Sequence, residues 1–168
     1  MITRQTPILL DTNAIVACHE MGCWRAICGA FPLETVETCI VEFQTGGHVL
    51  LSPDYVDEAT LRAQFAHIHD PQHIERAEVA LRGGHALHEG EKDLWAHALG
   101  RSDDVWVLCG PDRASMKFGC AQKLAQRLIS LESLLVHLRH PAVKTLEHLY
   151  SQAWLDDVRR KFILGIVQ

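Results

Sequence analysis

Short apolar runs that end at a turn or an acidic residue constrain the fold of this chain more than any other feature of its sequence. Residues 7–10 form one such run and lead directly into Asp11, and residues 105–109 form another that ends at Gly-Pro before Asp112. A short apolar run bounded by turn or capping residues is typical of a strand buried inside a parallel sheet. We therefore expect parallel strands joined by helical crossovers.

Two further segments complete the expected sheet. Residues 33–39 alternate apolar with polar side chains and are rich in β-branched ones, which favours a second, less buried strand, and residues 127–130 are expected to supply the last central strand. An extended piece is expected at residues 48–52, and helices at residues 14–30, 40–45, 54–70, 73–87, 91–99, 112–125, 131–138 and 143–162. This order predicts an α/β fold, a three-layer sandwich in which helices flank a central, mostly parallel sheet.

Length and composition fit one globular domain. The chain has 168 residues, of which 48% are hydrophobic and 22% charged, and one core suffices at this size, so we expect a single domain spanning residues 1–168. No apolar run approaches the roughly 20 residues that a membrane helix needs, which predicts no membrane association and a cytoplasmic location. The six cysteines show no paired CxxC spacing. We expect them to be structural free thiols.

The charge is unevenly distributed along the chain. The net charge is -5 at pH 7, which argues against a protein that grips nucleic acid by bulk attraction. However, residues 1–91 carry 5 basic and 13 acidic side chains, whereas residues 92–168 carry 11 basic and 8 acidic ones. A local basic face is therefore compatible with the acidic average.

Four acids fall where a parallel sheet gathers functional groups, at the carboxyl ends of its strands. Asp11 follows the first apolar strand directly, and Asp112 lies just past the strand at residues 105–109. Glu42 is expected in the first turn of the helix after the second strand, and Glu91, introduced by Gly90, is expected to open the helix GEKDLWAHAL. Converging carboxylates repel one another unless a divalent cation supplies the opposing charge, and oxygen-only ligands indicate Mg²⁺ or Mn²⁺. Such ions can activate water and stabilise both oxygens of a phosphodiester displacement.

Each acid also has a structural explanation that the sequence leaves open. Asp11 could cap the next helix, although Thr12 or Asn13 could do so as well. Glu42 and Glu91 could be acids favoured by the helix dipole, and Asp112 could be a turn residue after Gly-Pro. Asp93 is an alternative to Glu91 and points about 200° away from it on a helix.

The ordered series ILLDTN, VEF, GEKDLWAHAL and VLCGPDRAS resembles the PIN domain family, known from bacterial toxin–antitoxin ribonucleases, from Ile8 to about Ser130. The resemblance implies that Asp11, Glu42, Glu91 and Asp112 bind Mg²⁺ or Mn²⁺ as the catalytic acids of a ribonuclease, and that Thr12 and Asn13 shape the site around the first acid. It implies an RNA or DNA substrate, with an antitoxin protein or a second copy of the chain as partner. The fourth motif departs from the commoner Thr-x-Asp form, because Cys-Gly-Pro precedes Asp112.

Basic residues near these acids are candidates for substrate binding. Lys92 adjoins Glu91, while Arg113 and Lys117 follow Asp112 four residues apart and would share a helix face. Both could reach phosphates that flank a metal bound at Asp112. The alternative is that these side chains serve only solubility, as exposed charges commonly do.

Three other interpretations are weaker. The 11 histidines, including His67, His69, His73, His85 and His88, match no tight zinc spacing, so we expect surface or packing roles for them. A non-catalytic PIN-like interaction module would keep the fold without turnover, and the altered fourth motif favours it. A phosphohydrolase with an aspartyl nucleophile is disfavoured because DTN lacks its second Asp.

Overall fold

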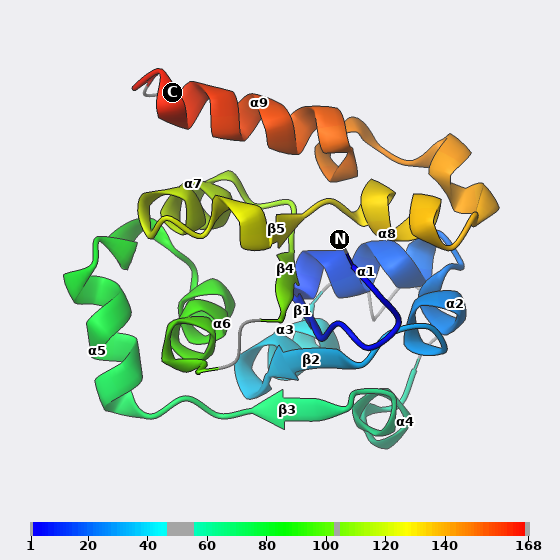
Figure 1. The fold of residues 1–168 in the computed structure, drawn as a ribbon. Coiled ribbons are helices and arrows are strands. Elements are labelled where there is room, and N and C mark those ends of the chain that lie inside the picture. The colour runs from blue at the N-terminus through cyan, green and yellow to red at the C-terminus, as the bar shows by residue number, and fades with distance from the viewer. Residues whose placement is uncertain (1, 47–55, 103–104, 167–168) are drawn as a thin grey trace.

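The computed structural model describes residues 2–46, 56–102 and 105–166. Within them, five strands form one parallel sheet in the order β3-β2-β1-β4-β5. The strands are β1 (Ile8–Leu10), β2 (Leu33–Val36), β3 (His67–His69), β4 (Val107–Cys109) and β5 (Leu128–Ile129). Helices cover both faces of this sheet, so the expected α/β sandwich is confirmed (Figure 1).

The described helices connect the strands and extend past the last one. They are α1 (Thr12–Glu20), α2 (Trp24–Cys28), α3 (Glu37–Thr45), α4 (Glu58–Ala63), α5 (His73–Leu81), α6 (Glu89–Gly100), α7 (Arg113–Ala121), α8 (Leu131–His137) and α9 (Gln152–Ile163). Short 3₁₀ turns lie at Gly84–Ala86, Ala125–Arg127, Pro141–Thr145 and His148–Tyr150. Figure 1 shows α5, α6 and α7 on one side of the sheet, α1, α2 and α8 on the other, and α9 running over α7.

Alternation along the strands divides the core between the two faces. In β1, Ile8 and Leu10 belong to the cluster that contains residues of α1, α2 and α8, while Leu9 belongs to the cluster formed with α5, α6 and α7. All three side chains are fully buried. A strand buried on both faces has no solvated side, which is why its sequence is continuously apolar.

The expected helix over residues 54–70 is wrong in its second half. Helix α4 ends at Ala63, and His67–His69 forms the edge strand β3. Leu61, Phe65 and Ile68 match a helical spacing, but pairing with β2, in which His69 lies opposite Val36, overrides that local pattern. The extended piece expected at residues 48–52 lies outside the described residues.

Other boundaries also differ from expectation, among them the end of the helix expected over residues 73–87, which stops at Leu81. The strand over residues 33–39 stops at Val36 and is buried along its whole length rather than half exposed, because helices pack on both of its faces. The helix expected over residues 143–162 begins only at Gln152, where the Ser151 hydroxyl accepts a hydrogen bond from the Trp154 amide at 3.1 Å and caps α9. The helix expected over residues 14–30 divides at Gly22, whose positive φ of 65° ends the first part.

The cysteines are free thiols, as expected, and all but Cys28 are buried. Over the described residues, no helix has the length and apolar composition that a membrane crossing requires.

The packing of α6 against α7 contains one buried polar pair, and its removal tests this core. The Trp95 indole N–H donates to the Ser115 hydroxyl at 2.8 Å, and both residues are buried. Ser115→Ala should lower the free energy of unfolding by about 1–3 kcal/mol, because it leaves a buried donor without a partner. Chemical denaturation measures this loss. The exposed Ser102→Ala is the control, and an equal effect of the two substitutions would contradict a stabilising role for the pair.

Candidate metal centre

Asp11 lies at the carboxyl end of the central strand and is also the N-cap of α1. Its Oδ1 accepts a hydrogen bond from the Ala14 amide at 2.7 Å, and its own amide donates to the Cys109 carbonyl at 3.3 Å. The expectation that Thr12 or Asn13 caps this helix is therefore wrong. One oxygen of Asp11 serves the cap, so the capping and metal-binding interpretations are compatible.

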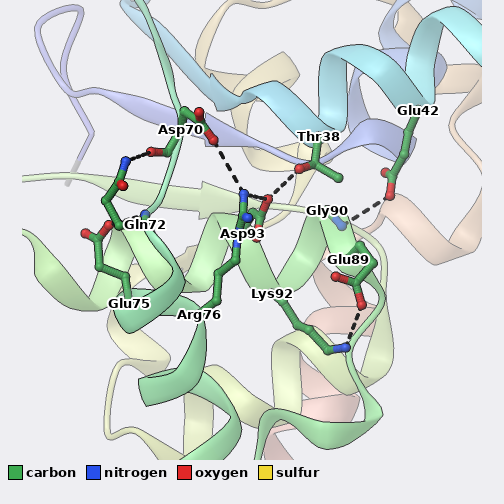
Figure 2. A network of polar contacts seen from close by, with 10 residues as sticks. All are labelled: Thr38, Glu42, Asp70, Gln72, Glu75, Arg76, Glu89, Gly90, Lys92 and Asp93. Carbon is green, nitrogen blue, oxygen red and sulfur yellow. Dashed lines mark hydrogen bonds and ion pairs between the residues drawn. The ribbon is translucent and has the colours of Figure 1, made fainter.

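Glu42 reaches the same place from α3. It lies in the second turn of that helix rather than the first, because the helix already begins at Glu37. The Thr12 hydroxyl donates to Glu42 Oε2 at 2.5 Å, and the Gly90 amide donates to Glu42 Oε1 at 3.1 Å (Figure 2). A Cβ at Gly90 would lie 2.6 Å from Glu42 Oε2, so only glycine permits this approach.

Glu91 is the third residue of α6, which begins at Glu89. Its side chain accepts a hydrogen bond from the His88 amide at 3.1 Å and completes a capping box. The side chain is buried nonetheless, with Glu91 only 7% exposed. The capping contact fixes the carboxylate and uses one of its oxygens, Oε2.

Asp112 caps α7, and its Oδ1 accepts a hydrogen bond from the Ser115 amide at 2.8 Å. It is partly buried. The residue two positions earlier, Gly110, packs directly against Asp11, and a Cβ there would collide with the Asp11 carboxylate. This close approach is a physical reason for glycine in the fourth motif.

Three of the four acids line one cleft of about 290 Å³, and Asp112 is not among its lining residues. The cleft is lined by Asp11, Thr12, Asn13, Cys39, Glu42, His88 and Glu91. Asp112 lines a neighbouring, larger cavity of about 830 Å³, but its charge acts on both Asp11 and Glu91. Of the four acids that the sequence predicts to converge, Asp11, Glu42 and Glu91 share one cleft.

Burial and repulsion from neighbouring carboxylates disfavour the ionised forms of Asp11 and Glu91. The pKa of Asp11 is raised to about 8, and burial is the largest cause. The hydrogen bond from the Ala14 amide lowers this pKa, whereas the negative charges of Glu91, Asp112 and Glu42 raise it. Burial, followed by the charge of Asp112, raises the pKa of Glu91 to about 7. Both carboxyls would regain an ordinary acidity if a cation lay among them.

The other two buried acids among the described residues, Glu34 and Asp93, each form an ion pair with an arginine. Glu34 lies 2.6 Å from Arg101, and Asp93 lies 2.6 Å from Arg76. The Asp93 carboxylate also accepts a hydrogen bond from Thr38, so it points away from the cleft and does not replace Glu91 (Figure 2). Across residues 2–46, 56–102 and 105–166, no ion pair involves Asp11, Glu42, Glu91 or Asp112.

The expected substrate-binding residues divide into three groups. Asn13 lines the cleft and Thr12 both lines it and holds Glu42. Arg113 and Lys117 line the larger cavity together with Asp112. Lys92 instead forms an ion pair with Glu89 at 2.7 Å on the exposed side of α6 (Figure 2).

Sequence reasoning missed several residues of functional interest. Cys39 and His88 line the cleft, and His88 could have been anticipated as the residue three before Glu91 in a capping box. Among the described residues, one group brings three possible metal-ligand atoms within 4.8 Å of one another. It consists of Glu34, His69 and His97. The His69 ring packs on that of His97 and contacts Glu34, so the packing role expected for His69 and a place in this group are compatible.

Comparison with protein-family models, with curated proteins and with solved structures found no match to this chain.

The raised pKa of Asp11 predicts how stability depends on pH without divalent cations. Between pH 3.8 and about 8, the folded chain holds a proton that the unfolded chain releases, so stability falls as the pH rises. Asp11→Asn keeps the cap but carries no charge, so it should become more stable than the unmodified chain by on the order of 2 kcal/mol near pH 8, with a smaller difference near pH 5. Denaturation in a chelator across this range measures the difference.

Asp57→Asn is the matched control for this experiment. Asp57 also caps a helix, α4, but it is exposed and its hydrogen bonds with Thr60 lower its pKa. A carboxylate whose pKa is lowered by folding stabilises the folded chain at pH values above its unfolded-state pKa. Asp57→Asn should therefore lower the stability at about pH 5 to 8, the opposite of the effect expected for Asp11→Asn. If Asp11→Asn followed the Asp57 pattern, Asp11 would be a helix cap without electrostatic cost.

Proposed function

We propose that this chain is a metal-dependent ribonuclease of the PIN type that hydrolyses phosphodiester bonds at the cleft of Asp11, Glu42 and Glu91, with Asp112 in the neighbouring cavity. One observation carries the proposal. Asp11 and Glu91 are buried among further carboxylates, whereas the other buried acids, Glu34 and Asp93, each pair with an arginine. A cluster of buried negative charge that the described chain does not neutralise is what a divalent cation would stabilise.

The donor atoms fit Mg²⁺ or Mn²⁺. The cleft offers carboxylate oxygens, and burial raises the pKa of the Cys39 thiol to about 12, so the thiol stays protonated and is a poor metal ligand. The close contacts of Gly90 with Glu42 and of Gly110 with Asp11 leave both carboxylates packed against backbone, which holds them in position. When bound, such cations lower the pKa of a water molecule and offset the charge that develops on the phosphate.

The chain's own residues would orient the site. Asp11, Glu42, Glu91 and Asp112 would hold the cations. Thr12 fixes the Glu42 carboxylate through its hydroxyl, and the His88 amide fixes Glu91. Asn13 faces the cleft without being buried, and we assign it a contact with the substrate.

The larger cavity supports the proposal that the sugar-phosphate backbone of the substrate approaches these acids through it. Asp112 lines it, as do four basic residues from three separated segments: Arg82, Arg113, Lys117 and Lys161. Arg82 and Lys161 also form ion pairs, with Glu78 and Asp157. Leu87, Phe118, Phe162 and Ile166 add apolar surface against which bases could stack. Positive and apolar groups next to an acid of the metal centre favour a single-stranded nucleic acid as the substrate.

Loss of one acid tests the proposed reaction. Asp11→Asn should lower Mn²⁺-dependent cleavage of single-stranded RNA by at least about a hundredfold, because it removes a charged ligand, and should remove most of the rise in melting temperature caused by Mn²⁺. Cleavage assays and thermal melts with and without Mn²⁺ measure both effects. Asp57→Asn makes the same chemical change at another helix cap and should retain both. Cleavage that persists undiminished in Asp11→Asn would refute the proposal.

Removal of basic charge tests the proposed substrate path. Arg113→Gln combined with Lys117→Gln should weaken RNA binding and reduce the slope of log K against log salt by about one, because fewer counterions are released. Mn²⁺ binding should stay unchanged. Arg25→Gln with Lys144→Gln removes an exposed Arg and an exposed Lys away from the cavity and is the control. Equal salt slopes in the two double variants would place the path elsewhere.

A further inference from the structure

A second cluster of metal-ligand side chains lies apart from the acid cleft. Glu34 comes from β2, His69 from the edge strand β3 and His97 from α6, and one ligand atom of each lies within 4.8 Å of the others. Glu91 and His97 share α6, but their six-residue separation corresponds to about 9 Å along the helix axis. The two groups are therefore separate sites on one helix.

The two histidines present their Nε2 atoms to the same oxygen. His69 Nε2 lies 2.8 Å and His97 Nε2 3.7 Å from Glu34 Oε2. The imidazole rings stack with centroids 3.5 Å apart and an angle of 14° between their planes. Glu34 is 6% exposed in its side chain, against 26% for His69 and 20% for His97, so the carboxylate lies at the base of the cluster and the rings lie nearer the solvent.

Arg101 contacts two of these three side chains. Its Nη1 lies 2.6 Å from Glu34 Oε2 and 3.3 Å from His97 Nε2. The guanidinium therefore touches both the carboxylate and one of the two imidazoles. A carboxylate oxygen and an imidazole nitrogen thus already converge on a positively charged group.

We propose that Glu34, His69 and His97 form a binding site for a late first-row transition-metal dication of the zinc class, and that Arg101 fills the cation position when no metal is bound. Two imidazoles and one carboxylate are a ligand set that holds Zn²⁺ in a tetrahedral site with one position left for water. Imidazole ligands favour Zn²⁺, Ni²⁺ or Cu²⁺ over Mg²⁺. The proposal does not depend on the ribonuclease function.

Two local movements accompany metal binding in this proposal. Arg101 withdraws from Glu34, because its charge would repel a dication at the same position. The rings of His69 and His97 turn toward the ion, because stacked rings have nearly parallel lone pairs and a tetrahedral ion needs converging ones. The partial exposure of both rings leaves space for this turn.

Competition with Arg101 gives the experiment its design. Zn²⁺ should bind the Glu34 cluster of the unmodified chain with a Kd below about 1 mM, and Arg101→Met should tighten this binding at least about tenfold, because it removes the competing charge. Binding is measured by calorimetry with Zn²⁺ and by the visible absorption of Co²⁺, which reports a tetrahedral site with nitrogen ligands. Zn²⁺ should also raise the melting temperature of Arg101→Met more than that of the unmodified chain.

Ring-conserving variants separate this site from the chain's other histidines. His69→Phe and His97→Phe in the unmodified chain should each weaken Zn²⁺ binding at least about tenfold, since each removes one of three ligands. His67→Phe is the matched control, because His67 is exposed and its ring lies 5.9 Å from that of His69 without belonging to the cluster. The control should bind as the unmodified chain does.

Several results would overturn the proposal. They are the absence of Zn²⁺ binding to the unmodified chain at 1 mM, unchanged binding in His69→Phe or His97→Phe, and a folded Arg101→Met that binds no more tightly than the unmodified chain. Any of these would leave Glu34, Arg101 and the two histidines as a structural ion-pair cluster. If Arg101→Met does not fold, the two histidine variants decide the question alone.

Discussion

The parallel pairing of β1 with β2 on one side and β4 on the other fixes the position of the acid cleft. Leu10 lies opposite Cys109 in this register, so the residues that follow the two strands, Asp11 and Gly110, leave the sheet side by side. Gly110 then packs on the Asp11 carboxylate, and Asp112 follows at the start of α7. Because hydrogen bonds between strands set the register, the distance between these acids depends on the sheet rather than on the flexibility of a loop.

Helix α6 carries acidic residues in two different electrostatic settings. Glu91 near its first turn lies among other carboxylates, whereas Asp93, two residues later, turns to Arg76. Burial raises the pKa of Glu34, beneath the end of the same helix, but hydrogen bonds from His97, Arg101 and His69 outweigh it and lower the pKa to about 2. The chain thus has the means to neutralise a buried acid and does so at two of them. Among the described residues no ion pair does so at Asp11 or Glu91, which costs stability, as is common at sites that bind charged ligands.

The sequence predicts the parts of this arrangement that depend on local pattern. The apolar runs at β1 and β4 identify the central strands. The acids that follow these runs could therefore be placed at the carboxyl ends of the strands from the sequence alone. It does not predict β3, because a three-residue edge strand whose sequence is His-Ile-His has no periodicity of its own and exists through pairing with β2. The Glu34 cluster was missed for a related reason. Glu34 and Arg101 are 67 residues apart, and the three possible ligands come from three elements whose contact depends on the tertiary fold.

Gly90 and Gly110 each lie where a side chain would collide with an acid of the cleft. Cys-Gly-Pro before Asp112 departs from the Thr-x-Asp form that the resemblance implies, and by sequence alone this departure favours a site without activity. In the structure, Gly110 lies where any side chain would displace the Asp11 carboxylate, and Gly90 stands in the same relation to Glu42. Each glycine therefore lets a carboxylate rest against backbone, and the Gly90 amide adds a hydrogen bond to Glu42. Two such contacts, from different elements, hold two acids in one cleft, so the departure is compatible with a working metal centre.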